Sequence, residues 1–316
     1  MQFSYSLKQF MKAHHPKISI GLTVYNGQNF LRESLDSITN QTFRDFELII
    51  SDNNSSDATQ DICREYATLD KRIRYFRNEK NLGVNLNCKR VFDLSTGEYF
   101  KWMADDDLYA PTYLAECLRV LEEDPSIVLC HSKTALIDQH GERILYDKKE
   151  NCFIDKYGNR YQELDPLNQV NLHEPHSRYG RVLKNIRWCH ASFGLIRAKE
   201  LRKINLERAY YGWDKAILVE LSLMGKFAEI PDELFFNRRH SNQSASLSTV
   251  EKSNYTKPGS QYGPLYCRLL CSTDYFLSIF RVQLKLIERV LSLKEFFFWM
   301  INPMPWRRLL QEIHRS

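Results

Sequence analysis

Three successive aspartates, Asp105, Asp106 and Asp107, are the side chains of this sequence best suited to chemistry. Like charges about 4 Å apart repel by roughly 1 to 4 kcal/mol, so the triplet favours a cation or another positive group among its carboxylates. Carboxylate oxygens select hard divalent ions, and Mg²⁺ commonly binds one or two of them while phosphate oxygens and water complete its shell. We therefore expect Mn²⁺ or Mg²⁺ here, together with a ligand that carries a diphosphate. The alternative is a solvated acidic turn that caps a helix starting near Pro111.

The basic segment 237–240 is a second candidate for binding phosphate. Guanidinium groups pair well with phosphate oxygens, and imidazole can ligate a metal ion. Arg239 and His240 are therefore expected to contact the diphosphate, with His240 also a candidate metal ligand; a solvated basic turn is the alternative. The sequence has no G-x-G-x-x-G, P-loop, G-x-S-x-G or H-E-x-x-H motif, which disfavours dinucleotide enzymes, P-loop ATPases, serine hydrolases and zinc peptidases.

The elements that would position these side chains alternate between strands and helices. Runs rich in β-forming residues at 17–25, 46–51, 73–77 and 98–104 are separated by segments with apolar residues at helical spacing. This alternation predicts an α/β fold with a single, mostly parallel, Rossmann-like sheet flanked by helices and joined by right-handed crossovers. Such sheets bind ligands at the carboxyl ends of their strands, where Asn26, Asp52 and the aspartate triplet all lie. The three clusters are therefore expected to form one site.

Four segments, in this order, resemble the family 2 glycosyltransferases. They are Val24-Tyr25-Asn26, the polar run 51–57, Asn81-Leu82-Gly83 and the segment 97–107, and the resemblance covers residues 17–245. It implies the A-type glycosyltransferase fold, a nucleotide-sugar donor with UDP favoured, a divalent metal ion and inversion at the sugar carbon. It also implies a set of donor-binding residues: Thr23, Tyr25, Asn26, Asp52, Asn81 and Asp105.

Within that resemblance, Asp52 is similar to the acid that reads the nucleoside, and Asp106 to the metal ligand of the family's D-x-D signature. The family commonly has an acid where this chain has Ala104, so Asp105 must supply that acid's contact with the donor unless the contact is missing. The ion is expected on Asp106 alone, or on Asp105 together with Asp107. Asp107 is therefore a candidate metal ligand as well.

Asp214 is the candidate catalytic base. It precedes a segment with strong helical spacing of apolar residues, so it lies at the positive end of a helix and could simply cap that helix. The segment from Gly212 to Lys226 also resembles the family's element in which an acid precedes a helix, and that acid is the base. By this resemblance Asp214 removes the proton of an acceptor hydroxyl, which attacks the anomeric carbon in a single displacement without a covalent intermediate.

The second half of the chain is less regular. Strands are expected at 127–130, 193–197 and 230–236, with a turn at 138–141. Residues 147–180 are polar and show no clear period, so we expect a long irregular loop that acts as a lid or acceptor loop; a disordered insertion is the alternative. The expected organisation is an N-terminal arm (1–16), a catalytic domain (17–245) whose halves 17–130 and 131–245 bind donor and acceptor, and a helical tail (246–316).

The tail accounts for most of the chain's net positive charge. The 316 residues have a formal net charge of +5, too small for a nucleic-acid binder, and residues 264–316 contribute +4 of it. Apolar residues recur there at helical spacing, followed by aromatic residues beside Lys and Arg. This pattern suits a helix lying on an anionic membrane surface. A helical cap on the catalytic domain and an oligomer contact are the alternatives.

The expected location follows from what the sequence does not contain. No apolar run reaches the roughly 18 residues that a membrane-spanning helix needs. The eight cysteines show no C-x-x-C spacing and the N-terminus has no signal pattern, so we expect a reducing, cytoplasmic location, peripheral at the membrane face.

The predicted function is a metal-dependent, inverting transfer of a sugar from a nucleotide sugar to an acceptor. The acceptor is expected to be a glycan or a lipid-linked molecule, in polysaccharide or glycoconjugate synthesis. Two alternatives use the same fold: a nucleotidyltransferase, and an inactive relative that serves as a membrane-bound assembly partner.

Overall fold

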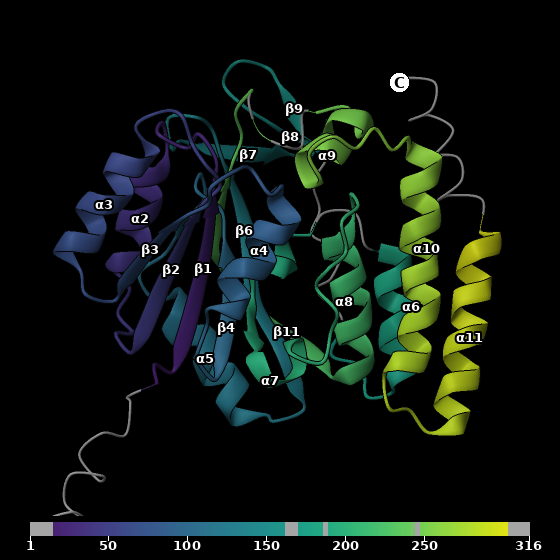
Figure 1. Ribbon diagram of the computed structural model, residues 1–316. Helices are drawn as coiled ribbons and strands as arrows, with labels where there is room; N and C mark the ends of the chain where they lie inside the picture. The colour runs from purple at the N-terminus through teal and green to yellow at the C-terminus, as the bar shows by residue number, and fades with distance from the viewer. Residues whose placement is uncertain (1–14, 162–169, 186–188, 242, 244–246, 303–316) are drawn as a thin grey trace, which may run out of the picture.

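The computed structural model describes residues 15–161, 170–185, 189–241, 243 and 247–302. Over these residues the chain forms one sheet with helices on both faces (Figure 1), as the sequence predicts. The strand order is β3-β2-β1-β4-β10-β6-β7-β8-β9, and β11 pairs with β6 and β5. The α/β fold class is thereby confirmed. Most of the expected N-terminal arm, residues 1–14, lies outside the described part.

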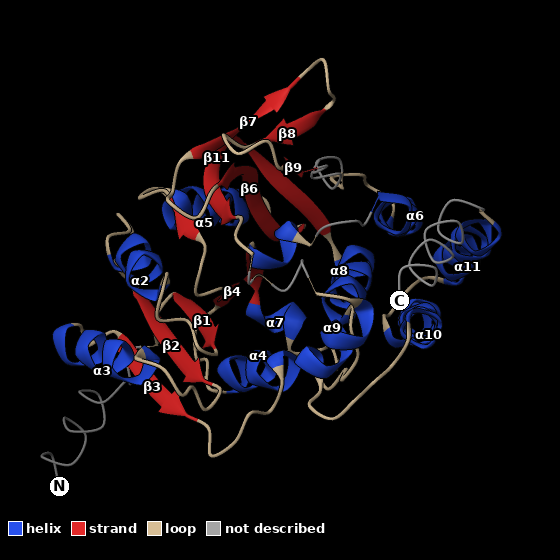
Figure 2. Cartoon of the chain, turned by 90° about the horizontal axis from the view of Figure 1, so that it is seen from above, coloured by secondary structure: helices blue, strands red, loops and turns tan. Residues whose placement is uncertain are grey.

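The first half of the sheet is parallel and follows the predicted elements closely. Its strands are β1 (Ile18–Val24), β2 (Phe46–Asp52), β3 (Ile73–Arg77) and β4 (Tyr99–Met103), and its helices are α2 (Leu31–Thr39), α3 (Thr59–Leu69) and α4 (Val84–Asp93). Every residue of β2 is buried, because helices cover both faces of the sheet: α2 and α3 lie on one face and α4 on the other (Figure 2). The carboxyl ends of β1, β2 and β4 consequently meet at one edge of the sheet.

The two faces of the sheet carry separate apolar cores. Leu22 and Ile50 belong to the core shared with α2, α3 and α5 (Tyr113–Glu123). Ile49 and Phe100 point to the opposite face, because successive side chains of a strand alternate. This second core is the larger, and it extends over α4, α6 (Pro175–Asn185), α8 (Trp213–Met224) and the C-terminal helices.

The second half of the sheet mixes strand directions. β10 (Leu195–Arg197), flanked by η1 (His190–Phe193) and α7 (Ala198–Leu201), is antiparallel to both β4 and β6 (Ile127–Ile137). β11 (Lys226–Arg238) is parallel to β6 and antiparallel to β5 (Leu108–Tyr109). The register of β11 shifts between Ile230 and Glu233, around Pro231, because proline has no N–H to donate. β6 and β11 are longer than predicted, and β11 carries residues 237–240 to the aspartate triplet.

Residues 147–180 are not the single irregular loop that the sequence predicts. They contain the strands β8 (Cys152–Ile154) and β9 (Arg160–Tyr161), which continue from β7 (Arg143–Asp147), and the start of α6; residues 162–169 lie outside the described part. The prediction is wrong here because β8 and β9 are only three and two residues long, too short to show a period in the sequence. In α6, basic residues interrupt the apolar spacing of the buried Tyr179, Val182 and Leu183.

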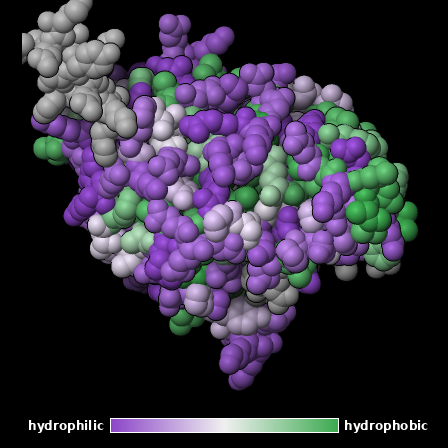
Figure 3. All heavy atoms as spheres, turned by 90° about the horizontal axis from the view of Figure 1, so that it is seen from below, coloured by the Kyte–Doolittle hydropathy of each residue, from purple (hydrophilic) through white to green (hydrophobic). Residues whose placement is uncertain are grey.

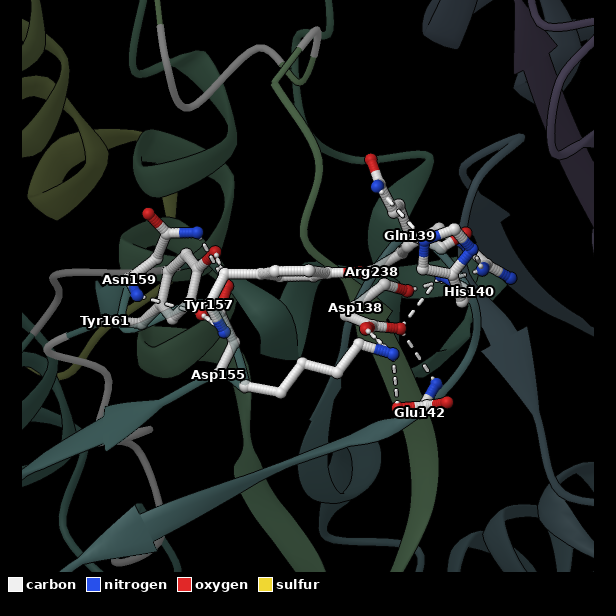
Figure 4. Close-up of polar contacts among 10 residues, drawn as sticks. Asp138, Gln139, His140, Glu142, Asp155, Tyr157, Asn159, Tyr161 and Arg238 are labelled. Carbon is white, nitrogen blue, oxygen red and sulfur yellow. Dashed lines mark hydrogen bonds and ion pairs between the residues drawn. The ribbon is translucent and has the colours of Figure 1, made fainter.

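Two turns led by aspartates shape this hairpin region, and Figure 4 shows them facing each other. Asp138 accepts hydrogen bonds from the backbone N–H groups two and four positions later, and Asp155 accepts the same two bonds in its own turn. A glycine follows each aspartate by three positions, Gly141 with φ of 80° and Gly158 with φ of 84°, a conformation that other residues rarely adopt. The repeated D-x-x-G spacing is the sequence signal that would have revealed the second turn.

The C-terminal helices are part of the folded domain. α9 (Thr249–Thr256) lies beside α4, α10 (Pro264–Arg281) packs on α8, and α11 (Leu286–Ile301) packs on α6 (Figure 1). Cys271, Tyr275 and Ile279 of α10 are buried in the core that includes α8. The expected division at residue 245 therefore does not separate two hydrophobic cores. Among the helices that the structure describes, none is both long and apolar enough to cross a bilayer.

Ile279→Ala tests the integration of α10. Ile279 is fully buried, so we expect its truncation to lower the free energy of unfolding by about 2 to 5 kcal/mol in urea denaturation. Leu277→Ala on the same helix is the control, because Leu277 is exposed and its loss should change the free energy by at most about 0.5 kcal/mol. Equally small effects of the two substitutions would contradict the packing of α10 into the domain.

Candidate active site

A cavity of about 420 Å³ lies at the carboxyl ends of β1 and β4. The predicted site residues that line it are Thr23, Tyr25, Asn26, Asp105, Asp106, Asp214 and His240. The other predicted site residues, Asp52, Asn81, Asp107 and Arg239, are not among its lining residues. Side chains from the end of β1, from the turn after β4 (residues 104–107, the β4 turn), from α8 and from the segment that follows β11 thus line one cavity.

The lining also contains residues that sequence reasoning missed. Trp102 and Trp213 meet edge to face with their ring centroids 6.0 Å apart, and Ile217 of α8 adds to this apolar side. Lys252 of α9 brings a cation, and its Nζ lies 5.3 Å from the ring centroid of Tyr211. In the sequence these residues look like ordinary core or surface positions, so only the fold reveals their place in the site.

The loop after β1 is fixed by hydrogen bonds to the loop after β2. Asn26 has φ of 55°, a left-handed conformation that asparagine tolerates better than most residues. Its N–H donates to Ser55 Oγ at 2.9 Å, and its Oδ1 accepts from the N–H of Ser56 at 2.8 Å. The N–H of Gly27 donates to Thr59 Oγ1 at 2.9 Å. These hydrogen bonds therefore hold in place the turn that forms the rim of the cavity next to β1.

Asp52 supports these loops from inside the protein. Its side chain is fully buried, its Oδ1 accepts from the N–H of Ser55 at 2.8 Å, and its Oδ2 accepts from the hydroxyl of Tyr75 at 2.8 Å. Arg77 lies 3.7 Å from the same carboxylate and compensates its charge. Both oxygens of Asp52 are thus used within the protein.

Asn81 belongs to a network of asparagines that the sequence analysis did not recognise. Its Oδ1 accepts from Asn53 Nδ2 at 2.7 Å. Asn78 Nδ2 donates to the Oδ1 atoms of Asn53 and Asn87, at 3.0 and 2.9 Å. Asn87 Oδ1 also accepts from Ser51 Oγ at 2.6 Å. Because unmatched buried amides are costly, such a network fixes the ends of β2 and β3.

Asp105 and Asp106 face the cavity in different surroundings. Asp105 lies so close to Gly27 that a Cβ on the glycine would come within 2.0 Å of Asp105 Oδ2. Burial, and then the neighbouring Asp106, raise the pKa of Asp105 to about 8. Asp106 pairs with His240, with 3.0 Å between Oδ2 and Nε2. The two adjacent carboxylates therefore have distinct partners.

Asp107 points away from the cavity. It is buried, and its Oδ1 accepts from Asn237 Nδ2 at 2.9 Å and from the N–H of Arg238 at 3.0 Å. Burial, and then Asp106, raise the pKa of Asp107 above its ordinary value. The third aspartate thus fastens the β4 turn to the end of β11.

Arg238, rather than Arg239, is the arginine that supports the triplet. Its guanidinium is fully buried; Nε donates to the carbonyl oxygen of Asp106 at 2.8 Å, and Nη2 donates to Glu33 at 2.7 Å. Nη1 also reaches the carbonyl of Asp138, so that Arg238 lies beside the hairpin turn in Figure 4. In the sequence Arg238 and Arg239 are indistinguishable, because only their contacts in the fold separate their roles.

Asp214 faces the cavity from the first turn of α8. The N-cap of this helix is Gly212, in the left-handed conformation with φ of 95°, so Asp214 is not the capping residue. A Cβ at position 212 would lie 2.8 Å from Sγ of Cys271 on α10. Glycine is therefore required both by the backbone conformation and by the close approach of α10.

A buried ion cluster ties the segment before Asp214 to α10. Arg208 pairs with Glu220 of α8, and both side chains are almost fully buried. Asp274 of α10 accepts a hydrogen bond from the hydroxyl of Tyr210, and its Oδ2 lies 3.5 Å from Arg208 Nε. Removing one partner of a buried pair leaves an uncompensated charge, so the cluster holds α8, α10 and the intervening segment in one arrangement.

The cavity therefore combines groups for two kinds of chemistry. Asp106 and His240 present an oxygen and a nitrogen 3.0 Å apart, a pair that suits Mn²⁺ or Mg²⁺. Within the described ranges no three His, Cys, Asp or Glu side chains converge as a metal site, so further ligands would come from a bound molecule and water. Asp214 can accept a proton from a molecule in the same cavity.

Several known proteins with related sequences are named as glycosyltransferases. The sequence profile described as Glycosyl transferase family 2 matches residues 19–181. An uncharacterized glycosyltransferase of Haemophilus influenzae is 26% identical over 308 residues, which cover 95% of this chain and 86% of that protein. The GalNAc(5)-diNAcBac-PP-undecaprenol beta-1,3-glucosyltransferase of Campylobacter jejuni is 31% identical over 149 residues, 47% of this chain and 42% of that protein.

Solved structures share the fold at low sequence identity. TarS of S. aureus, in complex with UDP-GlcNAc, superposes with a TM-score of 0.61 at 13% identity, covering 91% of this chain and 74% of that chain. The mannosyltransferase PcManGT of Pyrobaculum calidifontis, in complex with GDP-Man and Mn²⁺, gives a TM-score of 0.53 at 13% identity, with coverage of 99% and 81%. These likenesses establish the architecture alone.

Asp105 gives a prediction about pH. Its pKa of about 8 in the folded chain lies above its ordinary value of 3.8, so between these values the folded chain binds more protons than the unfolded chain. The free energy of unfolding therefore falls as the pH rises through this window. Asp105→Asn removes this contribution, and we expect the variant to lose less stability between about pH 5 and 8 in metal-free thermal unfolding.

Asp61→Asn is the matched control, because Asp61 is exposed in the first turn of α3. It should keep the slope of the unsubstituted protein. The same slope in Asp105→Asn would mean that the fold does not raise the pKa of Asp105.

Proposed function

The chain belongs to glycosyl transferase family 2, and on this premise we propose that it is a metal-dependent, inverting glycosyltransferase. It would move a sugar from a nucleotide-sugar donor, with UDP favoured, to a glycan or a lipid-linked acceptor. One observation carries the proposal: Asp106 with His240, and Asp214, far apart in the sequence, line a single cavity. That cavity lies at the edge where sheets of this kind bind their ligands.

We place the divalent ion, Mn²⁺ or Mg²⁺, on Asp106 and His240. When bound, such an ion stabilises negative charge on a departing diphosphate. Asp107 fits this role less well, because its Oδ1 already accepts two hydrogen bonds from β11. Asp105, whose raised pKa favours the neutral carboxyl, suits a hydrogen bond to the donor.

The donor would bind with its nucleoside near the end of β1, where Thr23, Tyr25 and Asn26 line the cavity. Asp52 and Asn81 would act through the loops that they hold, since both carboxylate oxygens of Asp52 and Oδ1 of Asn81 accept hydrogen bonds within the protein. Support for UDP comes from TarS, whose solved complex contains UDP-GlcNAc. The GDP-Man complex of PcManGT supports a nucleotide sugar in general.

We assign the cationic contact with the diphosphate to Lys252 in place of Arg239. Lys252 lines the cavity, whereas Arg239 is buried outside the cavity wall, where its Nη1 donates to Gln243 Oε1 at 3.2 Å. A lysine ammonium binds phosphate as a point charge. Arg239 would instead help to hold the segment after β11 in place through its hydrogen bond to Gln243.

Asp214 is the proposed catalytic base. It would take the proton of the acceptor hydroxyl as the acceptor oxygen attacks the anomeric carbon. The bond from that carbon to the diphosphate oxygen breaks on the opposite side, so the nucleoside diphosphate leaves and the sugar carbon is inverted. A positioned base contributes about 10² to 10⁴ in rate. Trp102 and Trp213 would help to keep water, a competing acceptor, away from the sugar.

The acceptor is proposed to be a glycan or a lipid-linked saccharide. The Campylobacter jejuni relative carries a lipid-linked acceptor in its name. A lipid-linked acceptor would place the reaction at a membrane surface, and we propose the cytoplasmic face, with polysaccharide or glycoconjugate synthesis as the process.

Asp214→Asn tests the base. We expect kcat to fall by about 10² to 10⁴ while the affinity for the nucleotide sugar changes little, because the substitution removes only the proton acceptor. Release of nucleoside diphosphate measures turnover, and the exposed Asp232→Asn on β11 is the control. Undiminished turnover of Asp214→Asn would refute this role, and release of pyrophosphate by the unsubstituted enzyme would favour a nucleotidyltransferase.

Asp106→Asn and His240→Ala test the ion site. Each removes one of the two proposed protein ligands, so each should weaken Mn²⁺ binding in the presence of UDP by at least about tenfold, measured by calorimetry. His140→Ala, at an exposed position in the hairpin turn, should leave the affinity unchanged. If neither ligand variant alters Mn²⁺ affinity, the ion binds elsewhere.

A further inference from the structure

The outer sides of α10 and α11 form an apolar surface that sugar transfer does not explain. Its large exposed side chains on α11 are Leu286, Ile287, Val290, Phe297, Phe298 and Ile301. On α10 they include Leu265, Leu269 and Phe280. We call these residues the α10–α11 face, and Figure 3 shows apolar atoms gathered at this edge of the molecule.

The two sides of α11 have different partners. Leu286, Val290 and Phe297 recur at spacings of four and seven, which places them on one side of a helix. Phe296 and Trp299 fall on the opposite side and are buried in the larger core. The helix is therefore anchored to the domain by its inner side, whereas the apolar side chains of its outer side are largely exposed in the described part of the chain.

The acidic side chains of α10 and α11 have partners within the domain, whereas two lysines of this region are exposed. Asp274 pairs with Arg208 and Glu295 with Lys184, and Glu288 accepts a hydrogen bond from the backbone N–H of His176. Lys285 and Lys294 are exposed, and in the described part of the chain neither pairs with an acid. The exposed charges beside the α10–α11 face therefore include the ammonium groups of Lys285 and Lys294, which no acid of the described residues neutralises.

We propose that the α10–α11 face docks on an anionic lipid surface. Lipid accommodates a broad apolar face rich in aromatic residues, and its headgroups attract the flanking cations. A second copy of this chain fits less well, because a two-fold contact would set like positive charges against each other. This inference rests on the membrane location proposed above and names the surface of the protein that would contact the membrane. No residue of the α10–α11 face lines the cavity, so the two proposals can be tested separately.

Vesicle flotation of the full chain tests the inference. We expect the protein to float with vesicles of phosphatidylcholine and phosphatidylglycerol, and less with phosphatidylcholine alone. The double variant Phe297→Ser/Phe298→Ser should lower the bound fraction at least about fivefold, and Lys285→Gln/Lys294→Gln should lower it on anionic vesicles only. Leu145→Ser/Tyr157→Ser, which removes exposed apolar residues from the hairpin region, is the matched control.

The outcomes separate this inference from the proposed function. Absence of flotation, or equal flotation of the Phe297→Ser/Phe298→Ser variant, would overturn it. A dimer in sedimentation that this variant converts to monomer would assign the face to self-association instead. Donor hydrolysis by the variant at the unsubstituted rate shows that folding and catalysis are intact, so that a failure to bind vesicles concerns the α10–α11 face alone.

Discussion

The negative charge of the aspartate triplet is the constraint around which this edge of the sheet is built. Three adjacent carboxylates repel one another strongly when they share one environment. The fold separates them: Asp105 lies against Gly27, Asp106 pairs with His240, and Asp107 is fastened to the end of β11. The end of β11 thereby becomes the partner of the β4 turn, and this brings His240 into the cavity.

The position of the proposed base, Asp214, depends on a different set of contacts. The segment before Asp214 rests on the buried pair of Arg208 and Glu220, and Gly212 permits the close approach of α10. α10 thus supports the active site with its inner side, while its outer side contributes to the α10–α11 face. In keeping with this division, Asp274 and Glu295 pair with Arg208 and Lys184 of the domain, whereas Lys285 and Lys294 are exposed.

The parallel half of the sheet was predictable because strands covered on both faces are continuous apolar runs, and polar clusters at their ends mark the ligand-binding edge. Sequence spacing does not tell which way a side chain points: Asp52 and Asn81 were expected to bind the donor, and neither is among the residues that line the cavity. Arg238 was missed because its partner Glu33 lies 205 positions away in the sequence. Residues 147–180 were misjudged because strands of three and two residues carry little periodic signal.

The central claim is that Asp106 and His240 hold an ion beside a diphosphate, within reach of the base Asp214. Anomalous diffraction from crystals grown with Mn²⁺ and UDP tests it most directly. The account predicts one strong anomalous peak within coordination distance of Asp106 and His240, with the diphosphate of UDP as a further ligand. A Mn²⁺ peak away from these two side chains, or UDP bound outside the cavity, would contradict it.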